Sequence, residues 1–281
     1  MTIAERESAV ALDGPGLSTR MSWLAVNLLL GLAPTLLFFA WVEQDCTWPA
    51  AGSLLGWPWI DPGIHSLAGR SAWNMGLFMA FGALHTIFAQ VGVQARVRSL
   101  VPAPAMRSFF LAVTGTALFV MMGLWQPTGV VVWRLPAPEP VGDILAFACF
   151  AATAAIILHM VARLGFFEFL GWAQLYGPAS DSARTAGTPR LRTNGIYGCV
   201  RHPVYTGLLA MFLLGPALSL DRLLLFLAAA AYLAVGIPIE ELKLIRLFGQ
   251  EYRDYRRRVP ALLPTGSLKA GLGPDPGRAE A

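Results

Sequence analysis

A short polar motif opens one apolar segment of the chain and combines a cation, an imidazole and a phenol. It reads Arg201-His202-Pro203, followed by Tyr205 and Gly207. Proline fits the first turn of a helix, because its missing N–H would have no acceptor there anyway. The free N–H groups of such a turn favour an anion such as a carboxylate. We therefore expect an anion-binding helix start at this motif.

Two adjacent carboxylates, Glu240 and Glu241, stand where the next apolar segment ends. If the two segments fold back on each other in a membrane, these carboxylates reach the same level as the Arg201-His202 motif. A zwitterionic ligand with a carboxylate, an amine and a sulfonium matches that arrangement. The alternative is purely structural, because basic residues often anchor membrane ends and glutamates often complement a helix dipole.

The composition of the chain indicates that its solvent is lipid. Of the 281 residues, 56% are hydrophobic and 14% are charged, against roughly a quarter charged in an ordinary soluble domain. The pI near 9.2 comes with basic residues that flank apolar runs, which favours a membrane protein over a nucleic-acid-binding one. The three cysteines, Cys46, Cys149 and Cys199, have no paired spacing. They predict neither a disulfide framework nor a metal site.

Six apolar stretches come close to the roughly 20 residues that cross a bilayer core. They are Ser22–Val42, Ser71–Val91, Met106–Trp125, Val141–Val161, Val204–Leu220 and Leu223–Ile239. Only Asp221-Arg222 separates the last two, which predicts a tight antiparallel helical hairpin. The expected fold is therefore an all-α integral membrane protein with about six transmembrane helices.

The basic residues predict the orientation of these spans. All of the 21 Lys and Arg residues except Arg70, Arg134 and Arg222 fall on one side. Because basic residues accumulate on the cytoplasmic side of a membrane, we expect both termini and both polar clusters in the cytoplasm. A bacterial inner membrane is the expected location.

The pattern formed by the two polar clusters resembles the isoprenylcysteine carboxyl methyltransferase superfamily of integral membrane enzymes. The shared residues are Gly195, Tyr197, Arg201, His202, Pro203, Tyr205, Gly207, Glu240, Glu241, Leu244 (one place along), Phe248, Gly249, Tyr252, Tyr255, Val259 and Pro260. A compound match of this length is specific, whereas Arg-His-Pro alone is not.

Upstream segments are similar to the bacterial methanethiol S-methyltransferase branch, which is grouped with NnrU-type proteins. The segments are His85-Thr86, Arg107-Ser108, Trp125-Gln126-Pro127 before Val132-Trp133, and Gly165–Tyr176. The chain departs from that branch in three places. Phe166-Phe167-Glu168 replaces a usual His-Phe-Asp run, and Ala173 and Pro238 stand where arginines are expected. These departures weaken the assignment of methanethiol as the acceptor more than they weaken the assignment of methyl transfer.

The resemblance implies that the second half of the chain binds S-adenosyl-L-methionine. The cofactor-binding residues that it implies are Tyr197, Arg201, His202, Pro203, Tyr205, Gly207, Glu240, Glu241 and Tyr252. The implied reaction is the in-line attack of a sulfur or a carboxylate oxygen on the sulfonium methyl group, for which no metal is needed. A small thiol or another membrane-soluble acceptor is expected to enter from the lipid bilayer, and no nucleic-acid partner is expected.

The composition of the chain, together with the resemblance, divides it into four parts. Residues 1–21 are expected to be a disordered leader, 22–161 the N-terminal transmembrane helices, 162–264 the cofactor-binding methyltransferase core and 265–281 a flexible tail. Within the core, Leu164–Tyr176 is apolar but too short to span, so we expect it to lie in the membrane interface or to re-enter the membrane shallowly. Residues 177–195 read as a flexible loop, and Glu240–Arg258 as one charged helix.

A thiol acceptor must lose its proton, because the thiolate is the nucleophile. His85 and His159 are the candidate bases within the spans, and an ionisable residue in a span is a functional hypothesis by default. Only His85 falls within the resemblance, so we take His85 and Arg107 as the catalytic pair. The alternatives are a helix–helix hydrogen bond for His85 and a membrane anchor for Arg107.

Three functions stay open on the sequence. The first is S-methylation of methanethiol, or of a related small thiol, to dimethyl sulfide. The second keeps the cofactor but methylates a carboxylate or a lipid-borne group. The third is a non-catalytic NnrU-type membrane accessory protein. A transporter is not favoured, because few charges lie within the spans and no inverted repeat is visible.

Overall fold

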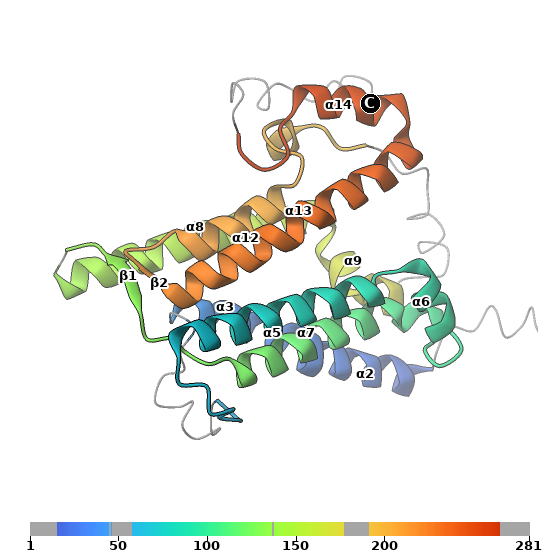
Figure 1. Cartoon of the computed structure of the whole chain (residues 1–281). Coiled ribbons are helices and arrows are strands. Elements are labelled where there is room, and N and C mark those ends of the chain that lie inside the picture. The colour runs from blue at the N-terminus through green and yellow to red at the C-terminus, as the bar shows by residue number, and fades with distance from the viewer. Residues whose placement is uncertain (1–15, 45, 47–57, 137, 177–190, 265–281) are drawn as a thin grey trace, which may run out of the picture. The chain divides into compact units, whose positions relative to one another are not determined.

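A computed structural model describes residues 16–44, 46, 58–136, 138–176 and 191–264 (Figure 1). The predicted tail, most of the predicted leader and most of the predicted 177–195 loop lie outside the described residues. The described chain is mostly helical, as the predicted all-α class requires. Two short strands, β1 (Val131–Arg134) and β2 (Ala217–Ser219), pair in a two-stranded sheet.

The chain forms two compact units. The first comprises the residues up to Val131 together with Val161–Gly187 and Ser219–Leu224. The second comprises Val132–Met160, Thr188–Leu218 and the residues from Leu225 onward. The four-part division expected from the sequence stays a prediction.

The first unit contains the helices of three predicted spans together with several shorter helices. Its elements are α2 (Leu17–Val26), the π-helix η1 (Asn27–Leu32), α3 (Ala33–Glu43), α5 (Leu67–Phe88), α6 (Val91–Val97), η2 (Ala103–Ala105), α7 (Met106–Leu124), α9 (Phe166–Leu170) and α10 (Trp172–Tyr176). The predicted interfacial segment is thus a pair of short helices, α9 and α10. They meet at Gly171, whose φ of +80° suits glycine.

The π-helical stretch η1 packs closely against α7. A Cβ atom at Gly115 would lie 2.2 Å from the Leu30 carbonyl oxygen, and one at Gly31 would lie 3.1 Å from the Leu111 backbone. Small residues at such crossings let two membrane helices approach through their backbones. The glycines therefore fix how these two spans pack.

The second unit holds the motif-bearing helices. Its elements are α8 (Glu139–Leu164), η3 (Gly195–Gly198), α12 (Pro203–Leu213), α13 (Leu220–Phe248) and α14 (Gln250–Arg258), with the last residues of α8 and the first turn of α13 assigned to the first unit.

Four helical segments of the described chain are long and apolar enough to cross a membrane. They are Leu17–Glu43, Ala103–Leu124, Pro140–His159 and Leu220–Phe248. The pair Leu67–Phe88 and Val91–Val97, bent by 70°, adds a fifth if it is one span. The chain is therefore multi-pass.

The two predicted helices are present as α12 and α13, but the predicted position of the turn between them, at Asp221-Arg222, is wrong. α12 ends at Leu213, and both residues lie in the first turn of α13. Pro216 follows the end of α12 and disfavours a helical residue before it. The Asp221 carboxylate accepts hydrogen bonds from Trp125 Nε1 at 2.9 Å and from the Thr128 hydroxyl at 2.6 Å. These bonds fix the start of α13 at a place that the apolar pattern does not reveal.

The predicted charged helix Glu240–Arg258 is also wrong as a single element. α13 continues through both glutamates to Phe248, and Gly249, with a φ of +62°, separates it from α14. Glycine adopts that conformation at little cost, so the chain can turn there. As a result the paired glutamates sit inside a long membrane helix, not at the start of a new one.

Candidate active site

The segment that follows α14 holds the Arg201-His202 turn in place. The Arg201 N–H donates to the Pro260 carbonyl at 2.9 Å, and the His202 N–H donates to the Ala261 carbonyl at 3.0 Å. Pro203 then begins α12, as predicted, and no described side chain caps that helix start. The turn is thus fixed by its backbone, and the first N–H groups of α12 stay available to a ligand.

Glu241 is the most heavily engaged carboxylate of the site, and its side chain is only 3% exposed. Its Oε1 accepts from Arg201 Nε at 2.7 Å and Nη2 at 2.6 Å, and lies 3.3 Å from His202 Nε2. Its Oε2 lies 3.1 Å from Arg256 Nε. A buried carboxylate with so many partners holds its surroundings together and has little capacity left for a ligand.

Arg201 extends this network to the end of α14. Its Nη1 donates to the Arg256 carbonyl at 3.1 Å and also to the Val259 carbonyl. The last carbonyls of a helix carry partial negative charge and lack intrahelical donors. One guanidinium therefore satisfies both the Glu241 carboxylate of α13 and the C-terminus of α14.

Glu240 behaves differently from its neighbour. Its side chain is 44% exposed, and among the described residues it accepts one hydrogen bond, from the Tyr205 hydroxyl at 2.9 Å. His202 Nδ1 lies 3.8 Å away, and the His202 ring stacks on Tyr205 with centroids 5.5 Å apart. Glu240 thus presents a carboxylate that still has lone pairs for a ligand.

Three tyrosines lie around this network. The Tyr255 hydroxyl donates to the Tyr197 carbonyl at 2.7 Å. Burial raises the pKa of Tyr252 to about 12, with Glu241 adding to the rise and Arg201 opposing it, and burial also raises the pKa of Tyr197 and Tyr255. These phenols therefore stay protonated near neutral pH and are poor bases. The buried Tyr252 hydroxyl has no hydrogen-bond partner among the described residues.

Gly207 lies on the buried face of α12. A Cβ atom there would lie 3.2 Å from Ile157 of α8, so helix packing alone explains the glycine. A cofactor contact at Gly207, and at Pro203, stays a prediction.

The other predicted pair, His85 and Arg107, lies in the first unit. Arg107 Nε donates to the Phe169 carbonyl at 2.8 Å, and its guanidinium lies over the Phe169 and Phe110 rings at 4.9 and 5.6 Å. Gly171 fits closely, because a Cβ there would lie 3.0 Å from the Arg107 side chain. No carboxylate among the described residues pairs with this guanidinium.

His85 contacts Phe110, one of the two phenylalanines beside Arg107. Its ring centroid lies 5.0 Å from that of Phe110, and its Nδ1 lies 3.2 Å from the Thr114 hydroxyl. That contact leaves Nε2 without a partner in the described part of the chain. His85 and Arg107 thus both contact the Phe110 ring. Their predicted role in the reaction with a cofactor bound by the second unit stays a prediction.

The structure brings together most of the predicted cofactor residues and adds some that the sequence did not single out. Arg256 is one of several arginines in α14, and nothing in its spacing marks it as the partner of Glu241. Thr114 and Asn27 were also missed. Asn27, wholly buried in η1, donates through Nδ2 to the Leu170 carbonyl at 2.6 Å. A polar residue inside an apolar run was the signal that could have identified it.

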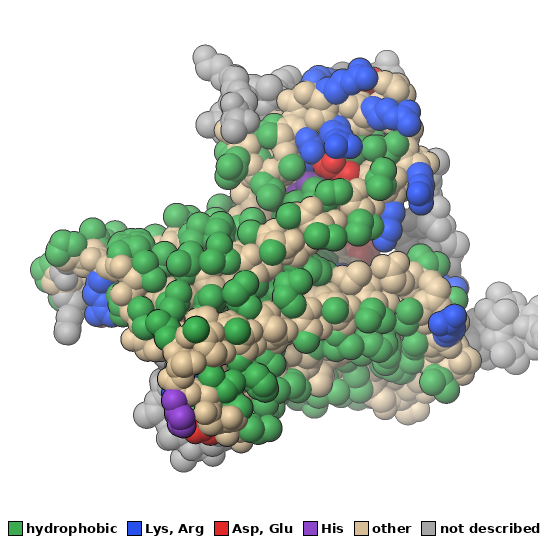
Figure 2. All heavy atoms as spheres, in the orientation of Figure 1, with side chains coloured by type: hydrophobic (Ala, Val, Ile, Leu, Met, Phe, Trp, Pro, Cys, Tyr) green, Lys and Arg blue, Asp and Glu red, His purple; other side chains and the backbone are tan. Residues whose placement is uncertain are grey.

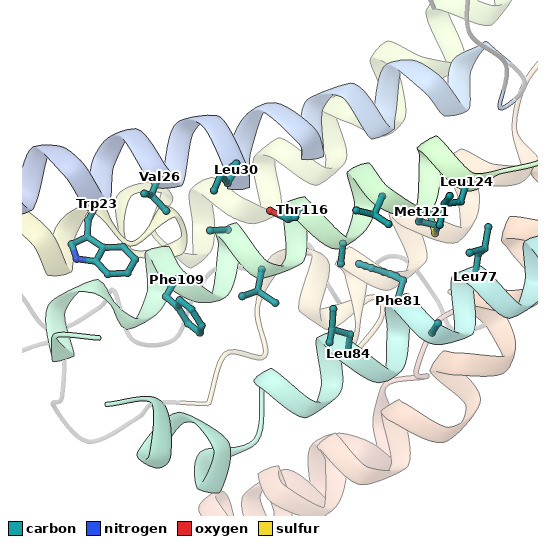
Figure 3. Close-up of a pocket in the computed structure, with 15 residues that line it drawn as sticks. Trp23, Val26, Leu30, Leu77, Phe81, Leu84, Phe109, Thr116, Met121 and Leu124 are labelled. Atoms are coloured by element: carbon teal, nitrogen blue, oxygen red, sulfur yellow. The ribbon is translucent and has the colours of Figure 1, made fainter. Parts of the chain in front are cut away.

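An apolar cavity of about 780 Å³ lies within the first unit, between α2, η1, α5 and α7 (Figure 3). Trp23, Leu30, Phe81 and Met121 line it, and Thr116 contributes a hydroxyl. None of its described lining residues is charged. The cavity therefore suits an apolar molecule and not a zwitterionic cofactor.

Comparison with known proteins gives a consistent result. A family model described as phospholipid methyltransferase matches residues 144–251, which run from α8 into α14. A methanethiol S-methyltransferase of Pseudomonas deceptionensis is 30% identical over 67% of this chain and 71% of that protein. Methanethiol S-methyltransferase 1 of Bradyrhizobium diazoefficiens is 27% identical over 94% of this chain and 91% of that protein.

These matches identify a membrane methyltransferase. The chain belongs to the family of the methanethiol S-methyltransferases. Nurim of Sus scrofa is also similar, at 29% identity over 62% of this chain and 69% of that protein. No solved structure matches the chain.

Proposed function

We propose that the protein transfers the methyl group of S-adenosyl-L-methionine to a small thiol, with methanethiol as the acceptor and dimethyl sulfide as the product. The single observation that carries the donor site is the asymmetry of the paired glutamates. Glu241 is buried and saturated, whereas Glu240 is partly exposed beside the uncapped start of α12. The similarity to methanethiol S-methyltransferases supports the thiol acceptor.

The residues of the second unit fit a zwitterionic cofactor. Glu240 can accept from an ammonium or hydroxyl group, and the uncapped N–H groups of α12 favour a carboxylate. The buried Tyr252 hydroxyl lacks a partner in the described chain, and a buried polar group normally has one. A ligand group that binds this hydroxyl would satisfy it.

The chemistry divides between the cofactor and the protein. When bound, S-adenosyl-L-methionine supplies a sulfonium methyl group and its own leaving group. We assign to His85 the removal of the thiol proton, because a neutral imidazole can accept one near pH 7. The Arg107 guanidinium stabilises the thiolate that remains. With the cofactor held at Glu240 and the start of α12, His85 would keep the thiol proton, and the sulfonium would supply its methyl group to the thiolate sulfur and leave as a neutral thioether.

The topology that we propose has six crossings, with both termini in the cytoplasm of a bacterial cell and the chain in its inner membrane. α12 has 11 residues, or about 16 Å at roughly 1.5 Å per residue. After a bend at Gly215 and Pro216, the strand β2 adds about 10 Å at roughly 3.3 Å per residue. Together they approach the ~30 Å core, so a short helix followed by a strand can provide most of the fifth crossing.

A lipid-borne methyl acceptor is the second candidate function. The match to the phospholipid methyltransferase model and the apolar cavity favour it. The departures at Phe166, Ala173 and Pro238 from the methanethiol branch also leave room for it.

Two measurements on the purified protein test the proposal. Calorimetric titration with S-adenosyl-L-methionine separates an enzyme from a non-catalytic accessory protein, because the accessory role predicts no binding. Incubation with methyl-labelled cofactor, bacterial lipid extract and methanethiol then separates the acceptors. We expect the label in the volatile fraction, and label confined to the lipid fraction would contradict a thiol acceptor.

A further inference from the structure

One exposed face of α13 changes from apolar to basic toward its C-terminus. Val235, Ile239 and Leu242 are 65%, 48% and 53% exposed. Lys243 and Arg246, both exposed, follow on the same face, because residues three and four apart on a helix are neighbours. The face therefore offers a hydrocarbon surface that ends in two cations.

These two cations have no partner within the described residues, unlike others nearby. Arg257 Nη1, for example, lies 3.4 Å from Asp254 Oδ1. The neighbouring acids of α13 are engaged elsewhere, because Glu240 accepts from Tyr205 and Glu241 from Arg201. The charge of Lys243 and Arg246 is thus not neutralised by the described protein.

The position of the cations along α13 matches the depth of lipid phosphates. A bilayer core of about 30 Å takes about 20 helical residues. Counted from Leu223, the first apolar residue after Arg222, the core ends at Leu242. Lys243 then stands at its edge, and Arg246 stands about 4.5 Å further out at roughly 1.5 Å per residue. The headgroup layer on each side is about 5–8 Å thick.

We propose that this face of α13 is a binding site for an anionic phospholipid. An acyl chain lies along Val235, Ile239 and Leu242, and the headgroup phosphate binds between Lys243 and Arg246. In Figure 2, Lys and Arg side chains gather over the end of α13 and over α14, so the surrounding potential also attracts an anion. The site does not depend on the identity of the methyl donor or acceptor.

The proposal distinguishes lipids that share acyl chains but differ in net charge. Each basic residue near a membrane surface contributes roughly five-fold in affinity for anionic lipid. A zwitterionic lipid brings the same hydrocarbon contacts and a phosphate, but its own ammonium offsets the attraction. The preference for the anionic lipid should fall as salt is added.

The test is a lipid titration of the purified full chain in neutral detergent, followed by native mass spectrometry. Dioleoyl phosphatidylglycerol and dioleoyl phosphatidylcholine are the two probes. We expect the wild type to bind the phosphatidylglycerol at least ten-fold more tightly. Lys243→Gln/Arg246→Gln should abolish most of that preference, and Arg246→Gln alone should lower it about five-fold.

Arg257→Gln is the matched control, because it removes an exposed cation that already has a carboxylate partner. It should keep the wild-type preference. A wild type without a preference, or a double variant that keeps it, overturns the proposal. If the double variant is poorly folded, the single Arg246→Gln variant decides, since an unchanged preference there also overturns it.

Discussion

Two partly buried arginines, Arg201 and Arg107, are held in opposite ways. Arg201 makes a short ion pair with a buried carboxylate and also donates to the last carbonyls of α14. Arg107 donates to a backbone carbonyl and lies over two phenylalanine rings, without a carboxylate among the described residues. The first cluster is balanced in charge, whereas the second keeps a net positive charge.

From this difference we propose that Arg201 frames a site and that Arg107 acts on a ligand. A buried ion pair fixes geometry, and breaking it leaves an uncompensated charge. Arg107 lies in the first turn of α7, and a cation there without a carboxylate among the described residues can attract an anionic ligand. We therefore assign Arg201 and Glu241 to the framework of the cofactor site, and Arg107 to the stabilisation of a thiolate.

The largest expected effect comes from breaking the balanced cluster. Glu241→Ala leaves Arg201 buried without its partner and should lower the free energy of unfolding by about 3–5 kcal/mol. Thermal unfolding of the detergent-solubilised protein measures it. Asp254→Ala, at an exposed pair on α14, is the control and should cost less than about 1 kcal/mol. Equal losses of unfolding free energy in the two variants would show that the buried ion pair of Glu241 is no more stabilising than an exposed one.

The next largest effect concerns the proton. His85→Gln should lower turnover of methanethiol about 100-fold at pH 7. Part of the rate should return as the pH rises toward about 9, because the solution then holds more thiolate. Calorimetry should give an unchanged cofactor affinity. A constant ratio of variant to wild-type rate across this range would assign His85 a structural role.

Arg107→Gln tests the cluster around Arg107, which keeps a net positive charge. Loss of the nearby positive charge should raise the apparent pKa of the reacting thiol by about one unit, which is roughly a ten-fold loss of rate at neutral pH. Arg107→Lys keeps the charge and should retain part of the rate. If both variants lose the same activity at every pH, the packing of Arg107 on its two rings matters more than its charge.

The smallest expected effect separates the paired glutamates. Glu240→Gln removes a partly exposed charge and should weaken cofactor binding about five- to ten-fold, or about 1–1.4 kcal/mol. The midpoint of thermal unfolding should hardly change. Calorimetric titration of the variant and the wild type gives the comparison, and an unchanged dissociation constant would remove Glu240 from the site.

The long apolar helices could be predicted from the sequence because a bilayer requires runs of that length. The stretches Ser22–Val42 and Met106–Trp125 correspond closely to helical spans of the structure. The boundary between α12 and α13 could not be predicted from apolar content. It depends on the contacts of Asp221 with Trp125 and Thr128, which are far away in the sequence.

The meeting of Arg201 and His202 with the paired glutamates was predicted correctly. The different roles of Glu240 and Glu241 were not, because adjacent residues on a helix point about 100° apart and their surroundings depend on packing. Arg256 was missed for a similar reason, since three neighbouring arginines in α14 have the same chemistry and only the fold selects one.

The most direct test of methyl transfer to a thiol uses a donor with a trideuterated methyl group. The purified protein is incubated with this S-adenosyl-L-methionine and unlabelled methanethiol, and the headspace is analysed by mass spectrometry. We expect dimethyl sulfide that carries one trideuterated methyl group, formed in equal amount to S-adenosylhomocysteine. Folded protein that binds the cofactor but releases no labelled dimethyl sulfide would contradict the proposed function.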